Sequence, residues 1–324
     1  MDIKEQRKPK RGGQPKSVAQ AAAGVVSRYT PRQGRLLDAR ARILEKRAKS
    51  ITFQHSVFCQ TALPYRNPGD DVRLWEREQG NASLLIEAGR ALDPRTHKWV
   101  EVGLPYGPKA RLVLLDLNQS ALRTQSPELA VGDSMTSYLA NRLGLDTNGR
   151  NIRGLKDQLG RLSAATIRLA VADSARGFQV DTKIISAFDL WFPKNENQRV
   201  LWPSVVRLSE DYFQSLMAHA VPLREDAIAA LAHSAMALDL YSWLAQRLHR
   251  VSRERPQFIP WAALKAQFGP EYDRMDNFKR FFRKQLRQVG LVYPEGRGSL
   301  DARGITLRNS PPPVAPSSLP AAKL

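Results

Sequence analysis

The sequence has 324 residues and contains a single cysteine, Cys59. One cysteine cannot form an internal disulfide or build a cysteine-based zinc site, so we expect a reducing compartment and a small, buried Cys59. Long hydrophobic runs are also absent, because no stretch approaches the roughly 20 apolar residues of a membrane-spanning helix. The Ala-rich stretch from Val18 to Val26 lacks the Leu-rich centre of a signal peptide. We therefore expect a cytoplasmic protein with no membrane segment.

Signatures of catalysis are missing as well. The five histidines are scattered, with no closely spaced pair of the kind that binds a metal. The nearest approach to a phosphate-binding loop, Gly103 to Ala110, has the wrong spacing and ends in alanine where Ser or Thr would hold magnesium. The acidic residues Asp70, Asp71, Glu76 and Glu78 have no partnering Lys or His constellation. We therefore predict a protein that is not an enzyme and that has no catalytic residue, no cofactor and no metal.

The sequence has fewer acidic than basic residues. It contains 31 Asp and Glu and 50 Lys and Arg, which gives a net charge of +19. A surface this positive attracts polyanions, so nucleic acid or an anionic membrane is the default partner, and an acidic substrate is a weaker alternative. Residues 1–50 contain 14 basic and 4 acidic residues, which is about half of the net charge. They include few large apolar residues, and we expect a disordered basic arm in which only Leu36 to Lys46 forms a short helix. This arm either binds phosphates or merely solubilises the protein.

The remaining sequence alternates short extended segments with helices, which predicts an α+β fold. In a first domain, residues 51–203, strands are expected at Ile51 to Gln60 and at Ala82 to Ala88. A helix that Asp133 or Ser134 caps is followed by a turn and by a basic amphipathic helix from Arg150 to Ala164. A hairpin of Thr166 to Ala172 and Gln179 to Phe192 comes next. A helix, a turn, a basic helix and a hairpin make the winged-helix arrangement, in which the second helix enters the major groove.

The same order recurs in a second expected domain, residues 204–309. A long helix from Asp226 to Arg250 and a short one from Trp261 to Phe268 precede an amphipathic helix from Met275 to Val289. A closing hairpin is expected from Leu291 to Pro294 and from Gly304 to Leu307. We therefore predict tandem winged-helix domains, followed at residues 310–324 by a disordered tail rich in Pro and Ser.

Basic residues on the last helix are the strongest binding signal. Residues 280, 283, 284 and 287 share one helical surface, where like charges repel by a few tenths of a kcal/mol per pair. An anionic ligand would relieve this repulsion, and arginine contacts both guanine and phosphate, whereas an ordinary solvated face is the alternative. The first basic helix is a weaker candidate because Asp157 interrupts its basic surface. The predicted DNA-binding residues of the two helices and hairpins are Arg150, Asn151, Arg153, Lys156, Arg161, Arg176, Lys279, Arg280, Arg283, Lys284, Arg287 and Arg297.

Several long strings also carry a family likeness. FCQTALPYRNP (58–68), GLPYGPKARLVLL (103–115) and GRNIRGLKDQLGRLSAATIRL (149–169) resemble the plasmid-encoded RepA replication initiator family of bacteria. FDLWFP, VLWPS, HAVPLREDAIAALAHSAMALDLYSWLAQRLHRV and PQFIPWAALKAQFG, within residues 188–269, extend the likeness. The resemblance covers roughly residues 51–314 and leaves out the basic arm.

The resemblance implies a protein that binds direct repeats in double-stranded DNA at a plasmid origin. It also implies recruitment of a host helicase, helicase loader or initiator, recognition helices at Arg150 to Leu162 and Asn277 to Val289, and no catalytic residue. Many initiators of this organisation shift between a monomer and a homodimer that represses its own promoter. A winged-helix transcriptional repressor that acts only by occupying its operator is the alternative, because it needs the same two basic helices.

Overall fold

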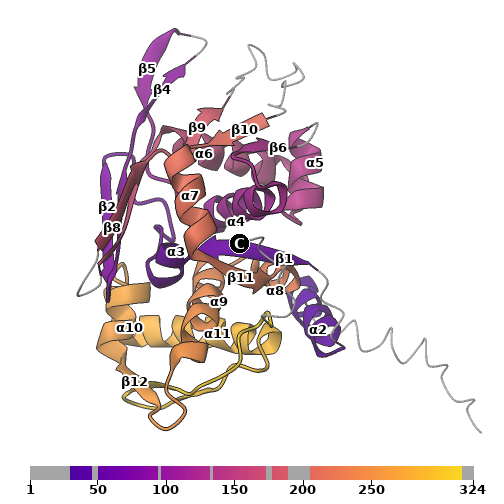
Figure 1. Ribbon diagram of the computed structural model, residues 1–324, viewed down its shortest axis with the longest axis vertical. Helices are drawn as coiled ribbons and strands as arrows, with labels where there is room; N and C mark the ends of the chain where they lie inside the picture. Colours follow the sequence, from indigo (N-terminus) through magenta and orange to yellow (C-terminus); the bar gives the residue numbers. More distant parts are fainter. Residues whose placement is uncertain are drawn as a thin grey trace, which may run out of the picture.

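A computed structural model describes residues 30–45, 50–93, 96–131, 134–172, 177–188 and 205–315. It contains both helices and antiparallel strands, so the α+β prediction is confirmed (Figure 1). A two-stranded ladder lies near the middle of the view. Helices α4 and α6 and most strands lie above this ladder, whereas α9, α10 and α11 lie below it.

The first described helix, α2 (Pro31–Leu44), belongs to the folded part of the chain. The Thr30 side chain caps it by accepting a hydrogen bond from the backbone N–H of Gln33. Leu36, Ala39 and Ile43 are buried, and α2 packs against two later helices, α8 (Glu225–Leu231) and α11 (Met275–Val292). The helix expected from Leu36 to Lys46 is therefore present with the bounds Pro31–Leu44, but it packs on the core and is not part of a disordered arm. Residues 1–29 and 46–49 lie outside the described residues.

The upper part of the fold is built on a four-stranded antiparallel sheet with the strand order β2-β3-β7-β8. The expected hairpin that begins at Thr166 is confirmed as β7 and β8, but β8 ends at Thr182 and a separate strand, β9, follows. The elements of this part are β2 (Leu74–Gln79), β3 (Ala82–Glu87), β4 (Arg90–Asp93), β5 (Lys98–Glu101), α4 (Gly107–Thr124), β6 (Glu128–Ala130), α5 (Met135–Ser137), a π-helical turn (Tyr138–Arg142), α6 (Gly149–Ala164), β7 (Thr166–Ala172), β8 (Gly177–Thr182), β9 (Ile185–Phe188) and β10 (Val205–Leu208).

The strand expected from Ile51 to Gln60 divides into two elements. Strand β1 covers Ile51–His55, and a short helix, α3, covers Ser56–Gln60. The change occurs at His55, whose ring Nδ1 accepts the backbone N–H of Val57 and so caps the helix. A histidine side chain can therefore end a strand that β-branched residues favour.

Strand β1 pairs with β11 (Ala220–Arg224), which lies 165 or more residues later in the sequence. The pairing is antiparallel and runs from Ile51 opposite Arg224 to His55 opposite Ala220. This ladder joins segments on either side of the expected domain boundary at residue 203, and one buried hydrophobic cluster includes residues from both sides. The division into domains 51–203 and 204–309 stays a prediction.

The rest of the described chain contains α7 (Glu210–His219), which lies above the ladder in Figure 1, and then α8 (Glu225–Leu231), α9 (Ala235–Arg247), a 3-10 turn (Leu248–Arg250), β12 (Gln257–Pro260), α10 (Trp261–Phe268), α11 (Met275–Val292), β13 (Gly298–Leu300) and β14 (Gly304–Leu307). Strands β12, β13 and β14 form a sheet in the order β12-β14-β13. The expected helix from Asp226 to Arg250 is wrong as one element, because Ser234 interrupts it and caps α9 by accepting the N–H of Ala237.

The end of the chain also differs from expectation. Residues 291 and 292 still belong to α11, so the first strand of the closing hairpin is Gly298–Leu300 rather than Leu291 to Pro294. Ser310 and Val314 are buried, and the Tyr293 hydroxyl donates a hydrogen bond to the carbonyl of Pro311. The expected disorder from residue 310 is therefore wrong for residues 310–315, and residues 316–324 are outside the described part.

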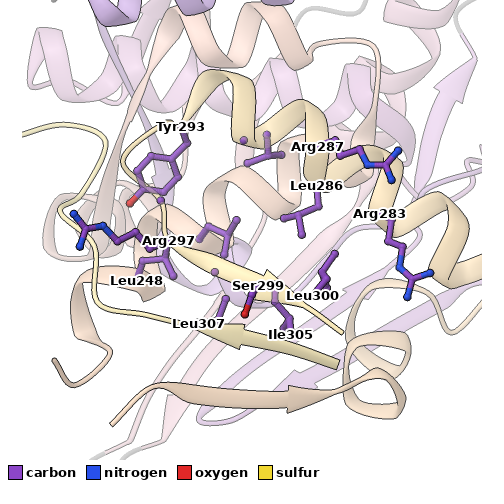
Figure 2. Close-up of a pocket in the computed structure, with 15 residues that line it drawn as sticks. Leu248, Arg283, Leu286, Arg287, Tyr293, Arg297, Ser299, Leu300, Ile305 and Leu307 are labelled. Carbon is purple, nitrogen blue, oxygen red and sulfur yellow. The ribbon is translucent and has the colours of Figure 1, made fainter. Parts of the chain in front are cut away.

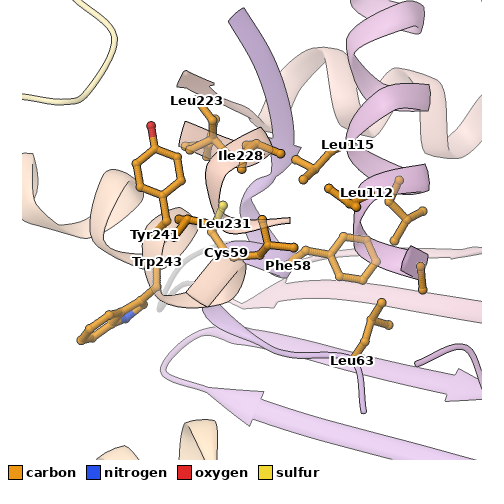
Figure 3. Packing of buried hydrophobic residues seen from close by; sticks show 14 of the residues in the cluster. Phe58, Cys59, Leu63, Leu112, Leu115, Leu223, Ile228, Leu231, Tyr241 and Trp243 are labelled. Atoms are coloured by element: carbon orange, nitrogen blue, oxygen red, sulfur yellow. The ribbon is translucent and has the colours of Figure 1, made fainter. Parts of the chain in front are cut away.

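The hydrophobic core lies around the central ladder and connects the two parts (Figure 3). Phe58 from α3 and Leu115 from α4 meet Leu223 and Ile228 beside the ladder. Cys59 is 2% exposed, as expected for a small apolar residue, and burial raises the pKa of its thiol.

Candidate nucleic-acid interface

Helix α11 has one buried and one basic face. Phe278, Phe282 and Val289 are buried, and the ring of Trp261 from α10 meets Phe282 edge-on with the ring centres 5.6 Å apart. This packing fixes the rotation of the helix about its axis, because large aromatic side chains fill the space beneath it. The remaining surface carries the five predicted cations, Lys279, Arg280, Arg283, Lys284 and Arg287.

All five cations of α11 are available to a ligand. Arg280, Lys284 and Arg287 are exposed, while Lys279 and Arg283 are half-buried, with their charged groups 5.5 and 5.2 Å from the centre of the Trp261 ring. Such cation–π contacts hold the charge in place without neutralising it. In the part of the chain that the structure describes, none of the five forms a salt bridge with a carboxylate. The repulsion expected from the sequence is therefore present.

A cleft separates α11 from the hairpin of β13 and β14 (Figure 2). It has a volume of about 480 Å³ and an apolar floor that includes Leu248, Leu286 and Leu307. Arg283 and Arg287 stand at one side of the cleft and Arg297, just before β13, stands at the other. The hairpin thus places Arg297 across the cleft from the basic helix, and the exposed guanidinium of Arg297 adds to the same positive surface.

Helix α6 supplies a smaller basic surface. Its N-terminus is capped by Asn148, which accepts the N–H of Asn151. Arg150 and Arg153 are exposed and Lys156 is half-buried. Lys109 of α4 lies beside α6. Its ammonium nitrogen is 3.1 Å from the position that a Cβ on Gly154 would take.

Lys109 was not predicted from the sequence. Burial lowers the pKa of its ammonium, and the positive charge of Arg150 lowers that pKa further. This coupling places Lys109 in the same basic surface as the N-terminal turns of α6. In the sequence Lys109 belongs only to a failed phosphate-loop pattern, and the 44 residues between positions 109 and 154 give no sign that the two helices pack together.

Arg161 was predicted to bind DNA, but the structure commits this residue to the protein interior. Its side chain is 9% exposed and forms salt bridges of 2.8 Å with Asp157 and 3.1 Å with Asp70. It also donates a hydrogen bond to the carbonyl of Leu104. Because its guanidinium is already neutralised and buried, Arg161 does not belong to the interface.

Asn151 and Arg176 were also predicted to bind DNA. The side chain of Asn151 donates to the carbonyl of Asp146, so it holds the turn before α6 as well as lying on the helix surface. Arg176 lies outside the described residues. The structure thus brings together two groups of cations, one at α11 with Arg297 and one at α6 with Lys109.

Neither a metal site nor a membrane helix is apparent in the described ranges. No group of three or more His, Cys, Asp or Glu residues there is arranged to hold a metal ion. None of the helices described is both long and apolar enough to cross a bilayer.

One protein-family model matches part of the chain. Residues 104–262 match the sequence model of the family described as plasmid encoded RepA protein. This segment, just under half of the chain, belongs to the plasmid-encoded RepA family. The match begins just before α4, includes α6 and α9, and ends within α10, so the basic helix α11 follows the matched segment.

Two solved structures are also similar to this chain, both of them crystal structures of domains 2 and 3 of RctB. The first, of a selenomethionine derivative, has a TM-score of 0.46 and 10% identity, and the match covers 79% of this chain and 96% of that one. The second has a TM-score of 0.45 and 11% identity, with 77% and 93% covered. No curated protein matches the chain.

Proposed function

We propose that this protein is a plasmid replication initiator that binds repeated double-stranded DNA at an origin. The match of residues 104–262 to the plasmid-encoded RepA family supports this role. The net charge of +19 supports a polyanionic partner, because cations that contact phosphates release condensed counterions from DNA. The role needs no catalytic residue and assigns none.

The element order near the C-terminus supports a winged-helix interpretation. Helix α9 is followed by β12, α10, α11 and the β13–β14 hairpin, and β14 lies between β12 and β13 in the sheet. We infer that α11 is the recognition helix of this unit and that the hairpin is its wing. In the other part of the chain, α6 is likewise followed by the β7–β8 hairpin, which is joined to β2 and β3. We infer that α6 is the second recognition helix.

One observation carries the proposal, namely the unpaired basic face of α11 among the described residues. Five cations on one helix without a carboxylate partner cost electrostatic free energy in the isolated protein. DNA phosphates and guanine edges would remove that cost, because arginine binds both through paired N–H donors. The α10 contacts that fix the rotation of α11 give this face a defined direction, which sequence-specific contacts need.

The remaining parts of the proposal concern partners and location. We propose that origin binding serves to recruit a host helicase, helicase loader or initiator, and that the protein acts in the cytoplasm on plasmid DNA. A homodimer that represses the promoter of its own gene stays a prediction. A repressor that acts by occupancy alone would use the same basic helices, so the arrangement of its binding sites must separate the two roles.

Footprinting tests the proposal. The purified protein is bound to the DNA that flanks its own gene, and protection from hydroxyl radicals is mapped at nucleotide resolution. We expect protection of several tandem direct repeats. A single protected inverted repeat would instead support the repressor, and the absence of any protected site would contradict sequence-specific binding.

A further inference from the structure

A second cleft lies beside the wing, on the far side of Arg297 from α11. It has a volume of about 430 Å³, and three arginines from three different segments line it. Arg253 belongs to the loop between α9 and β12, Arg297 precedes β13, and Arg308 follows β14. The other lining residues are Ser252, Pro256, Asn309 and Pro311, so no carboxylate faces the cleft.

Backbone hydrogen bonds hold these three segments together. The N–H of Arg308 donates to the carbonyl of Arg297 at 3.0 Å, and the N–H of Arg297 donates to the Ser310 hydroxyl at 2.9 Å. The Asn309 side chain donates to the carbonyls of His249 and Val251 and so ties the α9–β12 loop to the end of β14. The arginines therefore meet because the fold fixes their backbones, which is expected of a formed site rather than of three unrelated surface residues.

The charge in this cleft favours a phosphate group. Arg253, Arg297 and Arg308 are exposed, and none of them forms a salt bridge with a carboxylate of the described chain. Guanidinium groups bind phosphate oxygens through paired N–H donors, and the Asn309 amide and Ser252 hydroxyl add polar groups to the lining. Three arginines that line one cleft without a carboxylate partner favour the binding of an anion there.

The position of Arg297 indicates the source of that phosphate. Arg297 lines both this cleft and the cleft beside α11, which also contains Arg283 and Arg287. A row of arginines thus leads from the basic helix, past the wing, to Arg253 and Arg308. A single small anion would occupy only one of the two clefts, whereas a DNA backbone presents phosphates at regular intervals and can occupy both.

We propose that Arg253, Arg297 and Arg308 form a phosphate clamp that holds the DNA backbone beyond the base pairs contacted by α11. The inference rests on the proposed function, because α11 must first set the register of the duplex. The clamp contributes affinity but no sequence preference, since phosphate contacts are the same for every base pair. It lengthens the duplex that each binding unit needs.

The test compares two duplexes and two matched double variants. One duplex ends at the edge of the hydroxyl-radical footprint that α11 produces, and the other extends one further helical turn on the side of the wing. The clamp variant is Arg253→Gln with Arg308→Gln, and the control is Arg255→Gln with Arg123→Gln. The control removes the same charge from two exposed arginines, one of them in the same loop, and neither lines the cleft.

We expect the clamp variant to lose affinity only for the extended duplex. The slope of log affinity against log salt should fall by about 2 in magnitude, because roughly one counterion is released for each phosphate contact. This corresponds to about a tenfold smaller loss of affinity between 50 and 200 mM salt. The control should leave both duplexes unaffected, and urea denaturation should show equal stability for the three proteins. Equal losses on both duplexes, or no loss on either, would overturn the clamp.

Two further measurements separate this inference from the proposed function and from binding of free phosphate. If Arg283→Ala leaves binding to the repeats unchanged, the role of α11 fails, whatever the clamp variant does. Inorganic phosphate is titrated into the DNA-free protein at constant ionic strength and followed by calorimetry. Micromolar binding that the clamp variant abolishes, together with unchanged binding of the extended duplex, would make the cleft a site for free phosphate and overturn its role in DNA binding.

Discussion

Arg111 and Asp239 form a buried, two-pronged ion pair that joins α4 to α9. The Nε and Nη2 atoms of Arg111 donate to the two carboxylate oxygens of Asp239, each at 2.7 Å. The side chains are 3% and 11% exposed, and Arg111 also donates to the carbonyls of Leu63, Pro64 and Gly107. Because α4 packs against α6 and α9 packs against α11, this pair links the helices on which the two basic helices rest.

Removing one partner of this pair should destabilise the folded protein. We expect Asp239→Leu to lower the free energy of unfolding by about 3 to 5 kcal/mol, because a buried guanidinium loses its counter-charge. The double variant Arg111→Leu with Asp239→Leu should recover part of that loss, although three carbonyl groups lose a donor. Urea denaturation of the two variants and the wild type measures the difference. A double variant no more stable than Asp239→Leu would show that the unpaired charge is not the cause.

Acid should destabilise the protein through His55. Burial, with a contribution from His219, lowers the pKa of His55 to about 3 from its ordinary value of 6.5. The unfolded chain therefore binds a proton between these values that the folded chain does not, and stability that is complete above pH 6.5 is lost as the pH falls. The loss is about 1.4 kcal/mol per pH unit.

The variant His55→Asn isolates this effect. Asparagine can accept the Val57 N–H that His55 accepts in the wild type, but it does not titrate. We expect its free energy of unfolding, measured by urea denaturation from pH 7 to pH 4, to depend on pH less steeply by one proton. A slope equal to that of the wild type would assign the acid sensitivity to other groups.

Two glycines should respond to alanine in opposite directions. A Cβ at Gly304 would lie 2.1 Å from the carbonyl oxygen of Ile259, so Gly304→Ala forces β12 and β14 apart and should cost about 1 to 3 kcal/mol. Gly160 in α6 has open space around it, and Gly160→Ala should stabilise the helix by about 1 kcal/mol. Thermal unfolding of both variants measures these effects, and a stabilising Gly304→Ala would contradict the packing of the wing against β12.

Arginines of α6 should separate into two classes. We expect Arg161→Met to lower stability and leave the salt dependence of DNA binding unchanged, because its charge is engaged by Asp70 and Asp157. We expect Arg153→Ala to leave stability unchanged and to weaken DNA binding by about 1 to 3 kcal/mol if it reads a base. Fluorescence anisotropy with labelled repeats and urea denaturation distinguish the classes. The reverse pattern would contradict the orientation of α6.

Local signals in the sequence predicted most helices but not how they pack. The apolar spacing of Met275, Phe278 and Phe282 located α11, and Ser134, one of the two expected capping residues, begins α5. Ser234 was missed because a serine within an apolar stretch is compatible with a continuous helix. The structure shows that it accepts the N–H of Ala237 and begins α9.

The sequence did not predict contacts between residues that lie far apart along the chain. Nothing near Ile51 indicates that β1 pairs with β11, because an isolated strand pattern does not name its partner. The same limit explains the error at Arg161, which looked like the other cations of α6 until Asp70 was placed beside it. The basic face of α11 was predictable because it depends on helical spacing alone.

The most direct test of the account compares wild-type protein with Arg283→Ala on a duplex of direct repeats and on a scrambled duplex of equal length. Arg283 lines the cleft beside the wing and forms no salt bridge among the described residues, so its loss should leave the protein folded. We predict that affinity for the repeats falls by about 1 to 3 kcal/mol while affinity for the scrambled duplex changes far less. An unchanged ratio of the two affinities in a variant that remains folded would contradict α11 as the helix that reads the DNA.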